Sequence, residues 1–333
     1  MKVSVKKNKD CKVQMSIELE AAAVESRYQE VLRDFQRQAN LPGFREGRAP
    51  ADLVEKRYAD QAREELLKSL IPEVYHQSVR SQKVQPVSLP KISGVQYVRG
   101  QKLTFSAEFE EAPSVNVKNY KGLKLKRVTA EVSAEELEKA MQHLRESRAG
   151  QKETPPELND EFAKSMGLET LESLREAVKK ELSVYKRAES HEKMKIELFE
   201  KLLVMAAFPV PESLVDKQTE RLIADTRQHY ARLGMSEGQW KQEEEKVRSE
   251  AAARSKDQIK IYFILQRIAE LEEIEADEIE LAARIEALAK QSGRPAEEVR
   301  QMFEDDLRDS FREKKTVDFL IANAKFEEER SAS

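Results

Sequence analysis

The sequence predicts an α+β N-terminal head, with helices on a small antiparallel sheet, followed by a mostly α-helical, elongated body with helical arms. Apolar residues alternate along strand-length segments mainly in the first third of the chain, and later apolar residues recur at helical spacing. Charged residues make up 36% of the 333 residues, against about 25% in an average soluble protein. With only 10 glycines and 11 prolines, such a chain favours long, uninterrupted helices that expose much surface.

Two strands are marked by strict alternation of apolar and polar residues. The first covers residues 11–20 and the second covers residues 101–110. The apolar positions are Val13, Met15, Ile17 and Leu19 in the first segment, and Leu103, Phe105, Ala107 and Phe109 in the second. Residues 1–10 are expected to form a further strand, which pairs with the first through a turn near Asn8 to Asp10.

Two helices are expected between these strands, and they complete a head that covers residues 1–112. One helix covers residues 21–38, where apolar residues are spaced along one face. The other covers residues 51–81 and begins beside Pro50, where a missing backbone N–H is harmless. Pro72 lies inside this second segment, so it is expected to kink or break the helix.

Residues 113–150 are expected to connect the head to the body. Leu123 and Leu125 alternate with polar residues in an extended segment. Ser133 and Glu136 then have the spacing of a capping box, which predicts a helix over residues 134–148.

The body, residues 151–333, is predicted to be almost entirely helical. Its helices must pack pairwise, because helices of this length are marginal when isolated. The expected boundaries are a break at Pro209 and Pro211, a cap at Ser236 with Gln239, a cap at Asp277 with Glu280, an end at Gly293, and a last helix over residues 305–326.

The single cysteine, Cys11, excludes a disulfide framework within the chain and fits a reducing compartment. The polar, lysine-rich segment after Met1 does not look like a signal peptide. The longest apolar run, residues 202–210, contains proline and is too short to span a bilayer. A cytoplasmic protein that has no membrane partner is therefore expected.

Charge is distributed unevenly between the head and the rest of the chain. Residues 1–112 hold 19 basic and 16 acidic residues, a net charge of +3. The remaining residues hold 39 basic and 46 acidic residues, a net charge of -7. A mildly basic head suggests contact with a polyanion or an acidic protein, although a difference of this size is common.

The sequence offers no catalytic constellation, so no catalytic residue, metal site or cofactor is expected. None of the histidines has a second histidine at metal-ligand spacing, and no dinucleotide or phosphate-binding glycine motif is present. Nothing in the sequence marks a base for Cys11, which is interpreted as a small, partly buried side chain. The histidines, interpreted as ordinary surface or helix residues, are His76, His143, His191 and His229.

The segment NLPGFREGRAP, residues 40–50, is unusual because it places an aromatic residue on a glycine-rich loop beside arginines. Gly43 and Gly47 allow tight bends, which would leave Phe44 at the tip of a short protrusion with Arg45 beside it. Phenylalanine and arginine together suit a contact patch, in which the ring fills an apolar pocket and the guanidinium pairs with a carboxylate or phosphate. Alternatively, Phe44 folds back into the core of the head.

This loop resembles the ribosome-docking signature of the trigger factor family of bacterial chaperones. The resemblance extends to VQMSIELE before the loop, LVEKRYADQAREELL after it, LTFSAEFEEAP, and PVPESLVDKQ in the body. It implies a ribosome-binding head and a helical client-binding body with two SurA-like arms. Phe44, Arg45 and Gly47 match the family motif residue by residue, and Gly43 belongs to the same loop. Glu46 departs from it, because many members have lysine there.

A second departure concerns the domain content. The typical trigger factor inserts an FKBP-like prolyl isomerase domain after the connector helix. Here the connector passes directly into the body through LRESRAGQKETPPELNDEF, and no segment resembles that domain. The family's isomerase activity is therefore not expected here.

The sequence thus predicts an ATP-independent chaperone that docks on the large ribosomal subunit near the tunnel exit and shields nascent or unfolded polypeptides. The family links such a protein to protein folding, protein export and cell division. The alternatives are a prolyl isomerase, in keeping with the usual family activity, and a helical adaptor that binds no client. A weak homodimer is left open. The candidate client-binding residues in the body are Phe208, Met235 and Met302.

Overall fold

The computed structural model describes residues 1–42, 44–45, 47–128, 131–149 and 156–329. Contacts divide the chain into two compact units. One is formed by Met1–Ser114 with Phe208–Lys260, and the other by Val115–Ala207 with Ile261–Ser333. The segment 208–260, which the sequence assigned to the body, therefore groups with the head.

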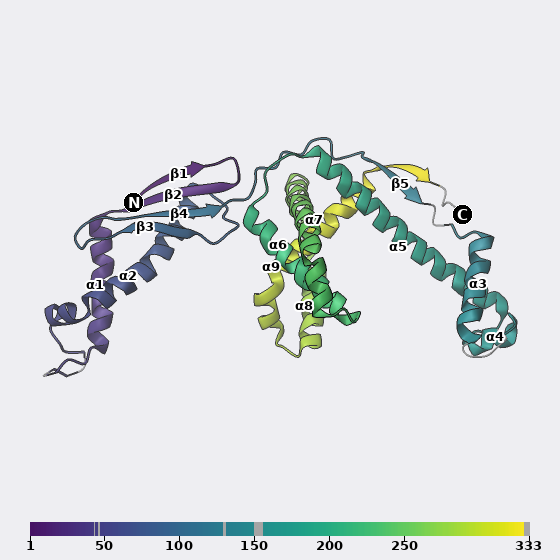
Figure 1. Ribbon diagram of the computed structural model, residues 1–333, viewed down its shortest axis with the longest axis horizontal. Helices are drawn as coiled ribbons and strands as arrows, with labels where there is room; N and C mark the ends of the chain where they lie inside the picture. Colours follow the sequence, from purple (N-terminus) through teal and green to yellow (C-terminus); the bar gives the residue numbers. More distant parts are fainter. Residues whose placement is uncertain (43, 46, 129–130, 150–155, 330–333) are drawn as a thin grey trace. The chain divides into compact units, whose positions relative to one another are not determined.

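A four-stranded antiparallel sheet organises the first unit (Figure 1). Its order is β1 (Lys2–Lys7), β2 (Lys12–Leu19), β4 (Leu103–Glu110) and β3 (Lys91–Gln96). The three strands expected from the sequence are confirmed. The fourth, β3, was not anticipated because most of its side chains are exposed and its register shifts between Ser93 and Gln96, which removes the alternating pattern.

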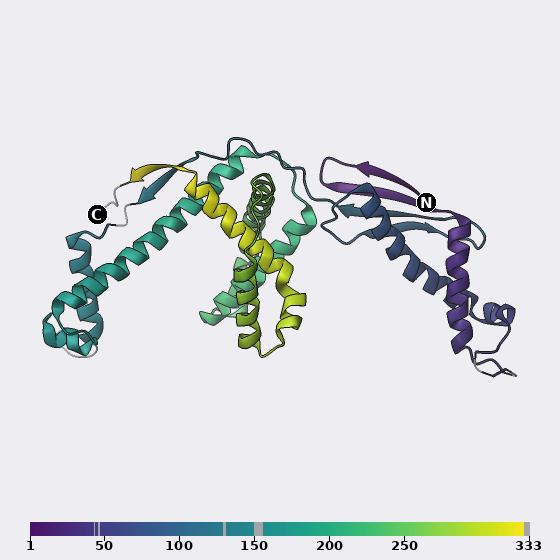
Figure 2. The same cartoon turned by 180° about the vertical axis from the view of Figure 1, so that it is seen from behind.

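Helices α1 (Ala21–Gln38) and α2 (Ala51–Gln82) cover the same face of this sheet, as both views in Figures 1 and 2 agree. The register of β2 and β4 places their apolar residues opposite one another, so that Met15 faces Ala107 and Ile17 faces Phe105. These side chains form one buried cluster with residues of both helices, including Leu66. The opposite face of the sheet carries polar residues.

Pro72 does not break α2, so of the kink or break expected from the sequence the break is wrong. The helix continues from Ala51 to Gln82 and ends at Lys83, which has a left-handed backbone conformation. Pro72 lies on the exposed side of the helix. The carbonyl that loses its hydrogen bond there has access to water, which lowers the cost of an interior proline.

The other part of the first unit is a helical hairpin of α6 (Glu212–Arg232) and the first part of α7 (Glu237–Leu271). Ile223, Trp240 and Ala251 form its buried contact. The expected cap at the start of α7 is confirmed, because the Ser236 backbone N–H donates to the side-chain Oε1 of Gln239 at 2.9 Å.

A buried carboxylate joins this hairpin to the sheet. Glu110, at the end of β4, is only 7% exposed and accepts hydrogen bonds from the backbone N–H groups of Glu212 at 3.1 Å and Ser213 at 2.9 Å. The Ser213 hydroxyl donates to the same carboxylate. Since Pro211 stands at the N-cap and offers no side-chain acceptor, Glu110 takes over the capping of α6.

The second unit contains a small parallel sheet of two strands. Three helices follow the first of these strands along the chain. Strand β5 (Lys124–Val128) pairs with β6 (Lys325–Glu329). The helices are α3 (Ala134–Ala149), α4 (Asp160–Ser165) and α5 (Leu171–Met205). The capping box expected at Ser133 is confirmed, because Ser133 N–H donates to Glu136 at 2.8 Å and Glu136 N–H donates to Ser133 at 3.2 Å.

A second hairpin is formed by α8 (Glu278–Ser292) and α9 (Ala296–Ala322), whose two helices lie side by side in Figures 1 and 2. The Asp277 cap and the left-handed Gly293 end are confirmed. The last helix was placed wrongly, because it begins directly after Pro295 and ends before Phe326. Phe326 instead belongs to β6, where Arg127 lies 5.5 Å from its ring centroid.

We expect Glu110→Ala to destabilise the hairpin of α6 and α7, because the substitution leaves two N–H groups at the start of α6 without their acceptor. The expected loss is about 1–3 kcal/mol of unfolding free energy. Fluorescence of Trp240, the single tryptophan, reports the transition in a urea titration of the whole chain. Glu108→Ala is the matched control, because that exposed carboxylate only reaches Gln14 at 3.5 Å. Equal midpoints for the two variants would show that the cap contributes nothing.

Candidate functional site

The loop that joins α1 to α2 has a packed base. Ala39 and Ala49 are 3% and 1% exposed, and they form a small cluster with Val54. The Gln36 side-chain amide donates to the Ala49 carbonyl at 2.7 Å, which ties the two sides of the loop together. The packed base lies beside the ends of both helices, and the loop projects from it.

The tip of this loop is exposed. Phe44 is 40% exposed, so it does not fold back into the core of the head. Its backbone N–H donates to the Leu41 carbonyl at 3.0 Å, and Arg48 N–H donates to the Arg45 carbonyl at 2.9 Å. Arg45 is exposed beside Phe44. Gly43 and Glu46, the other two residues expected at this tip, lie outside the described residues.

Gly47 has a backbone conformation and a position that favour glycine. Its φ of +74° lies in the left-handed region. A Cβ atom at this position would stand 3.3 Å from the Arg37 carbonyl oxygen, so a side chain there would push against the end of α1. The match of Gly47 to the family motif thus has a local structural reason.

The loop and its flanks are moderately basic. Residues 33–57 contain six basic and four acidic residues. Arg45 and Arg48 make no ion pair with any described residue, whereas Arg37 pairs with Asp34 at 3.1 Å. The tip therefore presents an aromatic ring together with arginine side chains that are available to an anionic or carboxylate-bearing partner.

The three candidate client-binding residues lie in different settings. Phe208 is half-buried at the start of the segment that precedes α6. Met235 is half-buried and packs against the Ile223 and Trp240 cluster, so it has a structural role in the hairpin. Met302 on α9 is 51% exposed. Phe208 and Met235 belong to the first unit, and Met302 belongs to the second.

Nothing in the described part of the chain contradicts the expectation that Cys11 is unreactive. Burial raises the pKa of the Cys11 thiol, and the carboxylates of Glu110, Glu111 and Asp10 raise it further. The thiol therefore stays protonated and donates to the Pro209 carbonyl at 3.4 Å. Among the described residues, no group of three or more acidic, histidine or cysteine side chains could hold a metal ion. No helix in the same ranges is long and apolar enough to cross a membrane.

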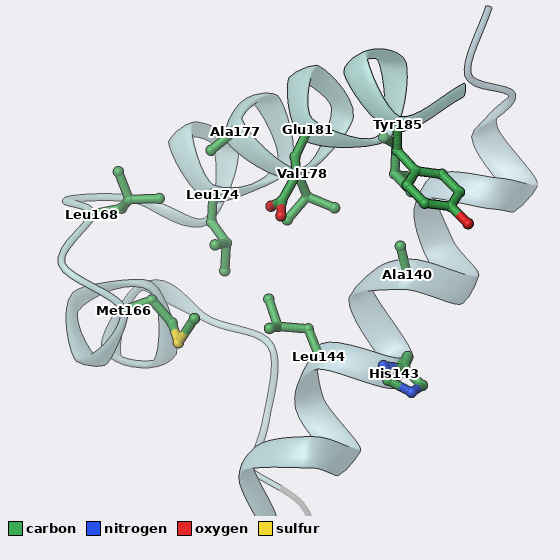
Figure 3. A pocket seen from close by; sticks show the side chains of 11 residues that line it. Ala140, His143, Leu144, Met166, Leu168, Leu174, Ala177, Val178, Glu181 and Tyr185 are labelled. Carbon is green, nitrogen blue, oxygen red and sulfur yellow. The ribbon is translucent and has the colours of Figure 1, made fainter. Parts of the chain in front are cut away.

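A second feature was not anticipated from the sequence. A groove of about 590 Å³ lies between α3, the segment that follows α4, and the first half of α5 (Figure 3). Its walls are mainly apolar, with Leu144 on α3 and Leu174 on α5 directed into the space between the helices. The sequence shows only that apolar residues in the body recur at helical spacing, and such periodicity does not separate a buried face from a half-open one.

Comparisons with known proteins decide the family. Residues 1–144 match the model of the bacterial trigger factor protein, and residues 170–322 match the model of its C-terminal part. The chain belongs to the trigger factor family. It is therefore a ribosome-associated molecular chaperone, as the resemblance of the loop of residues 40–50 and the helical body led us to expect.

Individual relatives can be aligned with this chain over almost their whole length. The trigger factor of Solibacter usitatus is 24% identical over 411 residues, which cover 95% of this chain and 97% of the relative. The trigger factor of Carboxydothermus hydrogenoformans is 26% identical over 426 residues, which cover 98% and 100%. A solved structure, reported under "Promiscuous Substrate Recognition in Folding and Assembly Activities of the Trigger Factor Chaperone", has the same fold. Its TM-score is 0.61 at 20% identity, over 97% of this chain and 99% of that chain.

The two family matches leave a gap after the connector helix, where the typical trigger factor has its isomerase domain. Only residues 145–169 lie between the two matched segments, too few for an independently folded domain. The alignment with the Solibacter protein is 78 positions longer than this whole chain of 333 residues. At least that many positions hold residues of the relative that have no counterpart here. The chain thus lacks an isomerase domain of the kind that typical members insert.

Proposed function

We propose that this trigger factor docks near the exit of the ribosomal tunnel through the loop of residues 39–50, with Phe44 and Arg45 as its main contacts. The exposed Phe44 ring on a packed base is the observation that carries the proposal. Leaving a large ring in water is unfavourable, by about 1.5–3 kcal/mol relative to full burial. The packed base limits the conformational entropy that the flanks of the loop lose on binding, which favours binding.

Arg45 and Arg48 supply the polar part of this contact. Both are exposed and unpaired among the described residues, so neither has to break an internal ion pair on binding. Guanidinium groups bind carboxylate or phosphate oxygens through two parallel hydrogen bonds. Both acceptors are available on a ribosomal surface, which is built from RNA and protein. Glu46 would oppose a negative surface, and Glu46→Lys is therefore expected to tighten binding.

The second unit offers surface for unfolded clients in the cytoplasm. Large apolar side chains are exposed along α5 and α9, among charged residues. These are Val184, Tyr185, Ile196, Val204, Met302 and Phe303. Each would bury only part of its surface against a client, so each contact is weak and binding depends on several at once. Release then needs no nucleotide, because a client that buries its own apolar residues withdraws these contacts.

We further propose that this chain is a chaperone without prolyl isomerase activity. The support is the short interval between the two family matches, and the 78 alignment positions that have no counterpart in this chain. A helical adaptor without client binding is less well supported. It would leave the exposed apolar side chains along α5 without a binding partner.

The docking proposal predicts that Phe44→Ala combined with Arg45→Ala abolishes most ribosome binding. Loss of a central aromatic and a paired arginine typically costs about 2 kcal/mol or more each, so binding should weaken well over tenfold. Co-sedimentation of the whole chain with ribosomes measures this. The matched control is Arg300→Ala with Phe303→Ala, because Phe303 is 41% exposed, close to the 40% of Phe44, but lies on α9 in the other unit.

The control variant should sediment with ribosomes like the parent, and both variants should melt like the parent. If the loop variant binds ribosomes as tightly as the parent, docking through Phe44 and Arg45 is wrong. If it melts much earlier than the parent, the lost binding would reflect unfolding, and Phe44 would be a residue of the core.

The absence of isomerase activity has its own test. Uncatalysed proline isomerisation takes tens to hundreds of seconds, so a proline-limited refolding reaction gives a slow phase that is easy to follow. We expect substoichiometric amounts of this chain to leave the rate of that phase unchanged. A rate that rises in proportion to the added chain would contradict the proposal.

A further inference from the structure

The returning limb of the loop, residues 47–49, runs close to the last turn of α1. A Cβ atom added at Gly47 would stand 3.3 Å from the Arg37 carbonyl oxygen. Two residues further along, the Ala49 carbonyl accepts a hydrogen bond from the Gln36 side-chain amide at 2.7 Å. Gln36 and Arg37 are neighbours near the end of α1, so this end of the helix lies against the limb at both points.

The Ala49 carbonyl takes its side-chain partner from outside the loop. Ala49 is 1% exposed, so water has little access to its backbone. A buried carbonyl that has no hydrogen bond is unfavourable, and such groups are rare in folded proteins. Among the described residues, Gln36 is the one side chain that donates to the backbone of residues 39–50.

This hydrogen bond lies where α2 begins. Pro50 is the N-cap of α2, and its carbonyl accepts from the N–H groups of Leu53 at 3.0 Å and Val54 at 3.1 Å. The proline ring fixes the backbone of Pro50 and also restricts Ala49 before it to extended conformations. The Gln36 amide therefore ties the end of α1 to a rigid helix start.

The two limbs of the loop are held in different ways. On the outgoing limb, Leu41 packs against the buried cluster at the base of the loop, and the Phe44 N–H donates to the Leu41 carbonyl at 3.0 Å. On the returning limb, the Arg48 N–H donates to the Arg45 carbonyl at 2.9 Å. Arg48 directly precedes Ala49, so the place of Arg45 follows from the limb that Gln36 holds.

We propose that Gln36 is a positioning residue for ribosome docking, because its amide holds the loop in the conformation that presents Phe44 and Arg45. Gln36 is half-buried and its amide is engaged with Ala49, so it acts through the loop backbone. This inference rests on the proposed docking through residues 39–50. It adds a residue outside the loop, and it assigns to that residue control over the rate of association.

The kinetics of binding separate a positioning residue from a contact residue. A loop that samples other conformations binds only from its competent fraction, and the apparent affinity falls in proportion to that fraction. The loss appears in the association rate, because the contacts in the docked state are unchanged. Removal of a contact such as the Phe44 ring appears mainly in the dissociation rate.

The first test is Gln36→Met, which keeps the length of the side chain and removes its donor. We expect the whole chain to associate with purified ribosomes about fivefold more slowly, as the loss of one typical intramolecular hydrogen bond would give. The dissociation rate should change by less than about twofold, whereas Phe44→Ala should raise it. Stopped-flow fluorescence of the labelled chain measures both rates.

Gln38→Met is the matched control, because it makes the same substitution two residues further along α1. Gln38 is exposed, and its amide makes no hydrogen bond within the described ranges of the chain. This variant should associate like the parent. If Gln36→Met also associates like the parent, if the two variants have the same effect, or if Gln36→Met changes only the dissociation rate, the inference is wrong.

A second test needs no ribosome. Hydrogen exchange resolved to single amides should show that Gln36→Met speeds exchange of the Arg48 N–H by about fivefold, because that N–H is bonded within the limb that Gln36 holds. The amide of Leu66, in the buried part of α2, should exchange as in the parent. Unchanged exchange at Arg48, or equally faster exchange at Leu66, would overturn a local role for Gln36.

These outcomes separate the inference from the proposed function. If Phe44→Ala combined with Arg45→Ala binds ribosomes like the parent, docking through the loop fails and the inference fails with it. If that variant loses binding while Gln36→Met keeps the rates of the parent, docking through the loop stands and only the positioning role of Gln36 fails.

Discussion

Apolar packing between the sheet and its two helices determines where the loop of residues 39–50 can be. The inward side chains of β2 and β4 are almost fully buried against α1 and α2, and each such side chain contributes about 1.5–3 kcal/mol. This core fixes the end of α1 and the start of α2, and the loop of residues 39–50 has to bridge them. The small cluster of Ala39, Ala49 and Val54 then closes the base of the loop, while Phe44 and Arg45 stay exposed.

At two other places in the molecule, buried residues also hold neighbouring elements in position. Glu110 ends a core strand and caps α6, which couples the sheet to the hairpin of α6 and α7. In the second unit, buried residues such as Met141 and Leu174 fix α3 against α5, while the apolar side chains above them remain half-open. In the loop and in the second unit, a well-packed base holds a less covered surface in place. Weak, reversible contacts with many clients require such surfaces, since a fully buried apolar residue has nothing left to offer.

Regular spacing of apolar residues in the sequence predicted the helices and strands that bury one face in a single hydrophobic core. Strands β2 and β4 and helix α1 have strict periodicity, so their positions were confirmed almost to the residue. Strand β6 was missed because Phe326 is the one apolar residue among its five and its partner strand β5 is distant in sequence. The loop was found because its glycines and prolines are local signals. The groove was not found, because its walls come from segments on either side of residues 150–155 and depend on tertiary packing.

The central claim is that Phe44 contacts the ribosome directly, and a photo-crosslink tests it most simply. Phe44 is replaced by a photoreactive phenylalanine analogue, which keeps an aromatic ring at the exposed tip, and the whole chain is irradiated on purified ribosomes. The same analogue at Phe303, with similar exposure on α9, serves as the comparison. The account predicts crosslinks from position 44 to a component of the large subunit, at much higher yield than from position 303. Crosslinks from position 44 that stay within the chain would contradict it.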